Sequence, residues 1–388
     1  MADKDLDSTA TGRSGGPAEI RPIGIGMLGY GFMGRAHSSA FRRLDYTTWQ
    51  PPLLPRLVAV AGRNEEAVAE AARRYGYERW TTDWRDLVAD ERVELFDNGG
   101  PNDLHAEPTI AAAEAGKHVL CEKPLGRTAD ESYEIWRRVA ATGVKHMCGF
   151  NYRFTPAARL ARELIDSGEL GEIRHFRAAY LKDSGVGPTR PSWRYDPEAA
   201  GSGALGDLAS HAVDLARYLA GEIASASALV RMFVPEHRVD DCLEAVVEFE
   251  NGAVGTLEAT RLALGRRNAF RWEINGSKGS LAFDLERMNE LEVFRDDGDR
   301  SRGFRQVLVS ERDHPFWQYW WPPGHIIGWG ETFVHELHHL LSAIAAGGEV
   351  GPHGATLEDG YRAAEVCDAF VRSSVHGRRE EVAYRTLT

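Results

Sequence analysis

The chain has 388 residues, of which 43% are hydrophobic and 27% charged, a balance typical of a soluble protein with two domains of ordinary size. Its 58 acidic residues outnumber its 46 basic residues, for a net charge of −12, which argues against a nucleic-acid or anionic-membrane partner. Four scattered cysteines without a C-x-x-C pair indicate neither a zinc cage nor a disulfide framework, and they favour a cytoplasmic location.

Residues 1–20 are polar and lack the hydrophobic stretch that a signal peptide requires, so we expect a disordered tail. From residue 22 to residue 147, short apolar runs alternate with helical stretches. Strands that are regularly separated by helices predict a parallel, doubly wound sheet. We assign residues 21–148 to this first domain.

A glycine-rich segment follows the first of these strands. Gly29, Gly31 and Gly34 have the G-x-G-x-x-G spacing, and the segment opens a helix. In that context the glycines permit a tight turn, a close approach to a pyrophosphate and close packing of helix on strand. The segment therefore predicts dinucleotide binding in a Rossmann domain, with a purely structural turn as the alternative.

The end of the second strand bears on the choice of coenzyme. An acid usually stands there to bind the adenosine ribose, but this sequence has Gly62 and Arg63. Without an acid to repel it, a 2′-phosphate could be accepted and could pair with Arg63. We expect NAD(P) with a slight preference for NADP. The alternative is that Arg63 stacks on adenine or faces water while NAD binds through the backbone.

The pattern changes after the first domain, and residues 149–388 are expected to form an α+β domain. Repeated β patterns occupy residues 224–310, and the turns "ENG" and "NGSKG" predict a large, mostly antiparallel, open sheet. One face of this sheet would have no helical cover within a single chain. We therefore expect a homodimer or a homotetramer.

Two segments contain residue types suited to catalysis. Lys123 ends a parallel strand in "KHVLCEKPLG", at the edge where such sheets bind ligands, although a surface charge is the usual fate of lysine. Asp207 and His211 stand four residues apart in "GSGALGDLASHAVD", on one face of a predicted helix. An acid in that position can orient an imidazole, and an ordinary surface pair is the alternative.

The segment "FVHELHHLLSAI" contains H-E-x-x-H, the helix signature of zinc peptidases, at His335, Glu336 and His339. On a helix, Leu337 belongs to an apolar stripe and both histidines fall on the opposite side. We expect a solvent-facing, histidine-rich helix face and no functional metal, with a zinc metalloprotease as a remote alternative. The aromatic segment 314–330 is expected to form a wall of the site, a subunit contact or packing over the sheet.

In their order, the glycine loop, "GPNDLHAEPTIAAAEAGKHVLCEKPL", "GFNYRFTPA" and "GSGALGDLASHAVD" resemble the glucose–fructose oxidoreductase and inositol dehydrogenase (Gfo/Idh/MocA) family over residues 22–376. The segment "SWRYDPEAAGSGALGD" and the early proline-rich insertion look most like its levoglucosan dehydrogenase branch. The resemblance implies a Rossmann domain followed by a domain with a large open sheet. It also implies NAD(P)-dependent oxidation or reduction of a hydroxyl on a sugar, anhydrosugar or cyclitol.

By the same match, Lys123, Asp207 and His211 are expected to be catalytic. His211 would take the hydroxyl proton, Lys123 would stabilise the alkoxide, and Asp207 would orient the histidine. The expected coenzyme contacts are Gly29, Gly31, Phe32, Met33, Gly34, Gly62, Arg63, Pro101, Asn102, His105, Glu122 and Lys123. The expected substrate contacts are Lys123, Tyr152, Arg153, Trp193, Tyr195, Asp207 and His211. A protein that senses the dinucleotide without catalysis is the alternative function.

Overall fold

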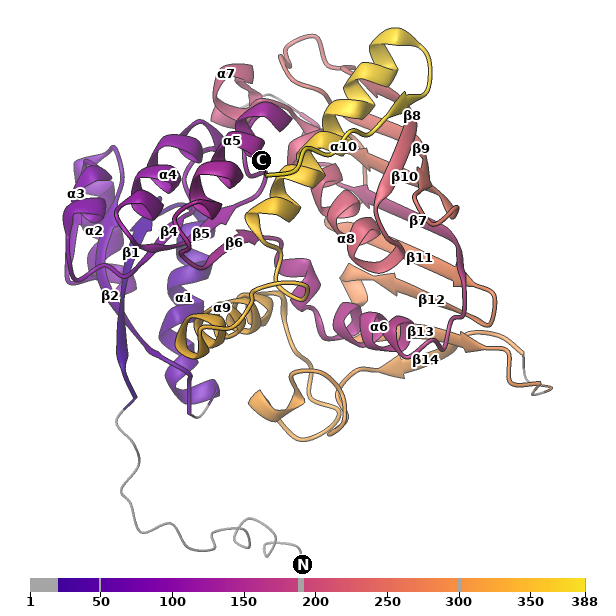
Figure 1. The fold of residues 1–388 in the computed structure, drawn as a ribbon, viewed down its shortest axis with the longest axis horizontal. Helices are drawn as coiled ribbons and strands as arrows, with labels where there is room; N and C mark the ends of the chain where they lie inside the picture. The colour runs from indigo at the N-terminus through magenta and orange to yellow at the C-terminus, as the bar shows by residue number, and fades with distance from the viewer. Residues whose placement is uncertain (1–19, 49, 188–191, 299, 301, 388) are drawn as a thin grey trace, which may run out of the picture.

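A computed structural model describes residues 20–48, 50–187, 192–298, 300 and 302–387. The expected disordered tail lies outside these residues, apart from Ile20. Two sheets stand on opposite sides of the molecule, and the two C-terminal helices run between them (Figure 1). Within the described ranges, none of the helices is both long and apolar enough to cross a membrane.

The first sheet has the strand order β3-β2-β1-β4-β5-β6, and all of its neighbouring strands are parallel. Its strands are β1 (Pro22–Leu28), β2 (Leu54–Ala61), β3 (Arg79–Thr81), β4 (Leu95–Asn98), β5 (His118–Glu122) and β6 (His146–Gly149). Its helices are α1 (Phe32–Thr47), α2 (Glu65–Tyr75), α3 (Arg85–Ala89), α4 (Ala106–Glu114) and α5 (Ala129–Ala140). The order reverses between β1 and β4, where ligands bind in such sheets. The predicted doubly wound sheet is confirmed.

The start of α1 differs from that of α2. Asn64 caps α2 by accepting a hydrogen bond from the Ala67 N–H, and Glu65 and Glu66 occupy its first turn. The residue that precedes α1, Gly31, makes no side-chain cap, and no acid stands in the first turn of this helix. The first N–H groups of α1 are therefore left for an anionic ligand.

In the described part of the chain, the second sheet has nine strands in the order β14-β13-β12-β11-β7-β10-β9-β8-β15. They are β7 (Ile173–Leu181), β8 (Ile223–Arg231), β9 (Cys242–Phe249), β10 (Val254–Thr260), β11 (Ala269–Gly276), β12 (Gly279–Asp284), β13 (Glu290–Arg295), β14 (Arg305–Leu308) and β15 (Glu380–Glu381). The neighbours β7 and β10 are parallel and the other pairs are antiparallel. The mostly antiparallel sheet is confirmed.

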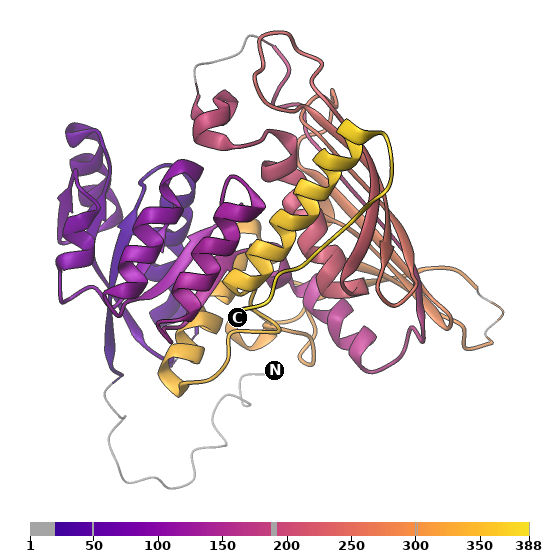
Figure 2. The same ribbon diagram turned by 45° about the horizontal axis from the view of Figure 1, so that its top comes forward.

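Helices cover one face of this second sheet. They are α6 (Pro156–Asp166), α8 (Ser210–Ala220) and α10 (Leu357–His376), while the short α7 (Pro197–Ala200) lies near the end of the sheet. Figure 2 shows the covering helices on the side that faces the first sheet, and the opposite side carries none among the described residues. The outer face of the sheet is therefore open in the single chain.

The helix α9 (Trp329–Ala346) follows the second sheet in sequence but packs on the first one. Phe333, Leu337 and Leu341 are fully buried in one cluster with Ile23 of β1 and Phe41 of α1. In Figure 1, α9 lies beside α1. The core of the first sheet is thus completed by residues from the C-terminal part of the chain.

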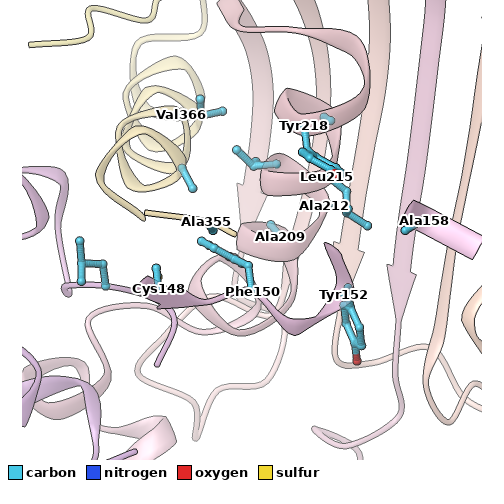
Figure 3. Packing of buried hydrophobic residues seen from close by; sticks show 14 of the residues in the cluster. Cys148, Phe150, Tyr152, Ala158, Ala209, Ala212, Leu215, Tyr218, Ala355 and Val366 are labelled. Carbon is cyan, nitrogen blue, oxygen red and sulfur yellow. The ribbon is translucent and has the colours of Figure 1, made fainter. Parts of the chain in front are cut away.

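A second core joins the two halves of the molecule behind the cavity described below. Phe150 and Tyr152, which follow β6, lie close to Ala209 and Ala212 at the start of α8, and Val366 of α10 packs from the other side (Figure 3). Burying a side chain of the size of Phe150 contributes roughly 1.5–3 kcal/mol. This core therefore fixes α8 relative to the first sheet.

Candidate active site

The glycine loop has the geometry that its spacing predicts. Gly29 has a φ of 96°, and a Cβ atom on it would lie 2.6 Å from the Gly99 carbonyl oxygen. A Cβ on Gly34 would lie 2.1 Å from the Gly29 carbonyl oxygen, so this glycine lets α1 pack against the turn. A Cβ on Gly31 would meet nothing within 4 Å. The loop therefore leaves open space over Gly31, at the start of α1, where a pyrophosphate fits.

One cavity of about 960 Å³ begins at this loop and extends to α8. Its walls come from both halves of the molecule, and Phe32 and Trp329 meet across it with stacked rings whose centroids are 5.2 Å apart. The predicted residues that line it are Gly29, Gly31, Phe32, Met33, Gly62, Arg63, Pro101, Asn102, Glu122, Lys123, Tyr152, Trp193, Asp207 and His211. A single cavity thus brings the expected coenzyme loop and the three expected catalytic residues together.

The adenosine end of the cavity has no acid at the end of β2. A Cβ on Gly62 would lie 2.1 Å from Cε1 of Tyr30, so the tyrosine ring occupies the space that an acidic side chain would need. Arg63 lines this end and is exposed to solvent. Trp84 also lines it, with the Arg85 guanidinium stacked over its ring at 4.4 Å.

Lys123, Asp207 and Arg261 form the polar centre of the other end. The Lys123 Nζ donates to the Asp207 carbonyl oxygen at 2.9 Å and lies 3.3 Å from its Oδ1. The Arg261 Nη2 lies 3.2 Å from Oδ2 of the same carboxylate. Burial alone would raise the pKa of Asp207, but Lys123 and Arg261 hold it well below its usual range. The peptide bond between Lys123 and Pro124 is cis.

His211 lies beside this centre on α8 without bonding to it. Its ring packs on Tyr152, with the ring centroids 4.5 Å apart, and its Nδ1 has no hydrogen-bond partner among the described residues. Burial, together with the charge of Lys123, lowers the pKa of His211 well below 6.5. Asp207 stands in a π-helical turn, Leu205–Ala209, that is wider than an α-helical turn. Among the described residues, the Asp207 carboxylate bonds to Lys123 and Arg261, and it acts on His211 only through its charge.

Two predicted substrate contacts do not line the cavity. Arg153 is only 2% exposed, and its guanidinium pairs with Asp214 (Nε to Oδ2, 2.9 Å) and Asp359 (3.1 Å). It joins α8 to α10 and is structural. The Tyr195 ring lies against that of His237, with the ring centroids 4.5 Å apart and the planes tilted by 35°, and it supports the loop that carries Trp193.

His105, a predicted coenzyme contact, is buried instead of lining the cavity. Its Nδ1 lies 2.8 Å from the Pro124 carbonyl oxygen and its Nε2 lies 3.1 Å from the Gly100 carbonyl oxygen. Its ring is 1% exposed. His105 therefore ties together the two loops that carry Lys123 and Asn102.

The carboxylate of Glu122 is hydrogen-bonded to a buried histidine, His37. The Nε2 of His37 lies 3.0 Å from Oε1 of Glu122, and its Nδ1 lies 2.9 Å from Oδ2 of Asp97. Burial opposes the protonation of His37, but Asp97 and Glu122 raise its pKa well above 6.5. The second oxygen of Glu122 accepts the Lys123 backbone N–H at 3.2 Å. A charged, fully buried histidine thus fixes the strand end that carries Lys123.

The H-E-x-x-H helix is buried, which corrects the expectation of a solvent-facing surface. His335 is 1% exposed; its Nδ1 lies 2.9 Å from the Phe154 carbonyl oxygen, and its Nε2 accepts the Trp320 indole N–H at 2.6 Å. The Nε2 of His339 lies 2.7 Å from the Val350 carbonyl oxygen. These bonds use the histidine nitrogens that a metal would need. Within the described residues, no group of three or more His, Cys, Asp or Glu side chains could hold a metal ion.

The sequence interpretation missed several cavity-lining residues that lie on the second sheet, at its strand ends or in the turn that carries Trp193. They are Tyr180, Lys182, Arg194, Arg261, Arg267 and Asn268. Tyr180 and Lys182 stand at the end of β7, and Arg261 directly follows β10. Because these two strands are parallel neighbours, their carboxyl ends meet at one edge of the sheet. Only a prediction of that parallel pair would have pointed to them.

Two family models match the chain. One, described as an oxidoreductase family with an NAD-binding Rossmann fold, matches residues 23–150, and the other, described as the GFO/IDH/MocA C-terminal domain, matches residues 158–282. Levoglucosan dehydrogenase of Pseudarthrobacter phenanthrenivorans is 43% identical over 381 residues, which cover 92% of this chain and 97% of the relative. Inositol 2-dehydrogenase of Rhizobium meliloti is 28% identical, with 93% and 99% covered.

Solved structures show the same relationship. Levoglucosan dehydrogenase in complex with NADH and levoglucosan has a TM-score of 0.91 and 43% identity, covering 94% of this chain and 100% of that chain. An oxidoreductase domain protein from Kribbella flavida has a TM-score of 0.90 and 44% identity, with 94% and 100% covered. The chain belongs to the GFO/IDH/MocA oxidoreductase family, and it is an enzyme with an NAD-binding Rossmann domain.

Proposed function

We propose that the enzyme transfers a hydride between a nicotinamide coenzyme and the hydroxyl-bearing carbon of a sugar, anhydrosugar or cyclitol. The observation that carries this proposal is the single cavity that joins the glycine loop to Lys123, Asp207 and His211. Relatives named for levoglucosan and inositol oxidation support the same substrate class. The nicotinamide ring, when bound, supplies the hydride acceptor.

His211 accepts the hydroxyl proton as the hydride leaves the same carbon. Its lowered pKa keeps the imidazole neutral near pH 7, which is the form that can take a proton. The ammonium group of Lys123 donates a hydrogen bond to the substrate oxygen and stabilises the charge that develops on it. Asp207 is a positioning residue in this mechanism, because its carboxylate holds both Lys123 and Arg261.

The start of α1 would hold the pyrophosphate of the coenzyme. Gly62 and Arg63 would bind its adenosine end, and Pro101, Asn102 and Glu122 would bind toward its nicotinamide end. A levoglucosan dehydrogenase structure in complex with NADH supports a nicotinamide coenzyme for this chain. The preference for NADP depends on Arg63 and stays a prediction.

The assembly is a homodimer or a homotetramer that forms through the open face of the second sheet. Leu229 of β8, Val246 of β9 and Val254 of β10 are exposed on adjacent strands, with exposed fractions of 54%, 58% and 50%. An exposed apolar patch on a flat sheet is suited to a second copy of the same surface.

A turnover assay tests the proposed function. The purified enzyme is incubated with NAD or NADP and a panel of anhydrosugars, sugars and inositols, and the absorbance of the reduced coenzyme is followed. Lys123→Met should lower kcat/KM by roughly 10²–10³-fold while the dissociation constant of the coenzyme changes little. Binding of the coenzyme without turnover of any panel member would support the dinucleotide sensor instead.

A further inference from the structure

The substrate end of the cavity contains more positive than negative charge. Lys123, Lys182, Arg194 and Arg261 all line it, and Asp207 is the acid that faces them. The other acid on the cavity wall, Glu122, is already paired with His37. Arg267, at the rim, pairs with Asp183. Four positively charged side chains therefore share a single carboxylate, that of Asp207, at this end of the cavity.

The single carboxylate does not neutralise this group. Asp207 is shared between Lys123 and Arg261, at 3.3 and 3.2 Å. Lys182 Nζ lies 5.4 Å from the centre of the Tyr180 ring, and Arg194 lies 4.5 Å from the centre of the Trp193 ring. In the part of the chain that the structure describes, neither cation has a carboxylate within 4.0 Å. Ring contacts favour a cation but leave its charge in place.

Burial makes this arrangement costly for the free enzyme. Arg261 is 4% exposed, and its Nη1 has no hydrogen-bond partner among the described residues. Burial lowers the pKa of Lys182, and the charges of Lys123 and Arg261 lower it further. Arg261 shares Asp207 with Lys123, Arg194 is exposed, and Lys182 is half-buried and, among the described residues, has no carboxylate beside it. A cation that is partly removed from water costs free energy unless a ligand supplies the counter-charge.

We propose that the substrate carries an anionic group, a carboxylate or a phosphate, that binds to Lys182, Arg194 and Arg261. This inference rests on the proposed function and narrows its substrate class to acidic or phosphorylated sugars. The ammonium group of Lys182 supplies a charge-assisted donor for the anionic oxygens, and the guanidinium of Arg261, which lines the same wall, adds positive charge. The Tyr180 ring lies beside Lys182 and 6.1 Å from the His211 ring, so the anion site and the base share one wall of the cavity.

Pairs of sugars that differ in charge test this inference. D-Glucose is compared with D-glucuronate, D-galactose with D-galacturonate, and D-glucose with D-glucose 6-phosphate, in the enzyme that is saturated with reduced coenzyme. Quenching of coenzyme fluorescence gives each dissociation constant, and kcat/KM is measured with the oxidised coenzyme. We expect at least one anionic member to bind about tenfold or more tightly than its neutral partner, which corresponds to about 1.4 kcal/mol.

Lys182→Met removes one cation and keeps a side chain of similar length. It should abolish most of the preference for the anionic member over its neutral partner, because the Coulomb attraction of Lys182 acts on the charged group. The matched control is Lys278→Met, since Lys278 is an exposed lysine in the turn between β11 and β12 and does not line the cavity. Lys278→Met should keep the full preference for the anionic member of each pair.

The outcomes separate this inference from the proposed function. Equal constants within every pair, tighter binding of the neutral members, or a preference that survives Lys182→Met would overturn the anion site. Turnover of neutral sugars in that case would leave the proposed function intact. A preference for the phosphate and not for the uronates would identify a phosphate as the group that is bound. Coenzyme binding without turnover of any member would refute the proposed function, whatever the anion titrations show.

Discussion

The surroundings of His211 lower its pKa, and among the described residues its Nδ1 has no hydrogen-bond partner. Asp207, one helical turn before His211, bonds to Lys123 and Arg261 instead. Burial and the nearby lysine both favour the uncharged imidazole, and Asp207 opposes them only through space. The positive charges around His211 thus keep its imidazole in the form that accepts a proton. The same charges also stabilise an alkoxide on the substrate.

This charge state predicts the pH profile of the oxidation. The neutral form of His211 is the active one, and its pKa in the folded enzyme lies well below 6.5. Activity should be lost only when the pH falls through that lowered pKa, so kcat/KM should stay constant from mildly alkaline pH down through 6.5. His211→Asn should lower kcat by roughly 10²–10⁴-fold and remove the acidic limb of the profile. An acidic limb at or above pH 6.5 in the wild-type enzyme would contradict this assignment.

The presence of Arg63 at the adenosine end of the cavity leads us to expect a preference for NADP. A charge-assisted contact to a 2′-phosphate contributes roughly 1.5–3 kcal/mol, or about tenfold or more in preference. Arg63→Ala should therefore weaken NADP binding about tenfold more than NAD binding, as measured by titration of each coenzyme. Gly62→Asp is a poor companion test, because its Cβ would collide with the Tyr30 ring. Equal weakening of both coenzymes would show that Arg63 stacks on adenine.

Prediction from the sequence worked for residues in a defined local motif and failed for those placed by distant contacts. The glycine loop and Lys123 line the cavity because strand, turn and helix fix their positions locally. Arg153 was expected to contact substrate, but its partner Asp359 is more than 200 positions away and cannot be inferred from spacing. The ion pairs of Asp207 could not be inferred from spacing either, since Lys123 follows β5 and Arg261 follows β10.

At the scale of elements, α9 shows how helical periodicity can mislead. Its apolar stripe was identified correctly, and Phe333, Leu337 and Leu341 are buried as expected. The opposite side was expected to face solvent, but other segments cover it, and Phe316 stacks on His335 with ring centroids 4.0 Å apart. Periodicity reports which side of a helix is apolar, and it does not report whether polar residues are covered by a second layer.

Glu336, the acid of the H-E-x-x-H sequence, gives a test of this burial. It is fully buried, neither of its oxygens has a hydrogen-bond partner among the described residues, and burial raises its pKa well above 4.5. Because the unfolded chain ionises Glu336 near pH 4.5 and the folded protein keeps it protonated, folding must take up a proton above that pH. The free energy of unfolding is therefore not reduced by Glu336 below about pH 4.5, and it falls as the pH rises toward the folded pKa. The variant Glu336→Gln should unfold less readily than the wild type at neutral pH.

The gain should grow with pH, by about 1.4 kcal/mol in the free energy of unfolding for each pH unit above the unfolded pKa, until the folded pKa is reached. Urea unfolding of both proteins at pH 5, 6 and 7 measures it. A difference that does not change with pH would mean that Glu336 is ionised in the folded enzyme. A catalytic glutamate of a zinc peptidase would need to be ionised, so the same measurement also addresses that alternative.

For the molecule as a whole, both sheets and their connection types were predictable, because strand–helix alternation and repeated β patterns are local signals. The sequence did not predict that β7 and β10 pair in parallel or that α9 packs on the first sheet. Each of these depends on contacts between segments far apart in the chain. The missed cations Lys182 and Arg261 follow from the first of these features, because they directly follow β7 and β10.

The open face of the second sheet predicts the assembly. Val246→Arg places a charge at the centre of the exposed apolar patch and should convert the wild-type oligomer into a 43.0 kDa monomer at micromolar concentration. Sedimentation equilibrium measures the mass. Val375→Arg is the matched control, since Val375 is a 75% exposed valine on α10 and should leave the oligomer intact. A wild-type protein that sediments as a monomer would contradict the proposal.

The position of α9 also has a consequence for the order in which the chain can fold during synthesis. The residues of the first sheet end at Gly149, but the helix that completes their core ends at Ala346. At about 5–20 residues per second, the ribosome needs on the order of 10–40 s to make the intervening segment. During that interval the apolar surface of β1 and α1 lacks its partner. We therefore expect the unfinished N-terminal half to bind chaperones during synthesis. We also expect truncated chains that lack α9 to aggregate.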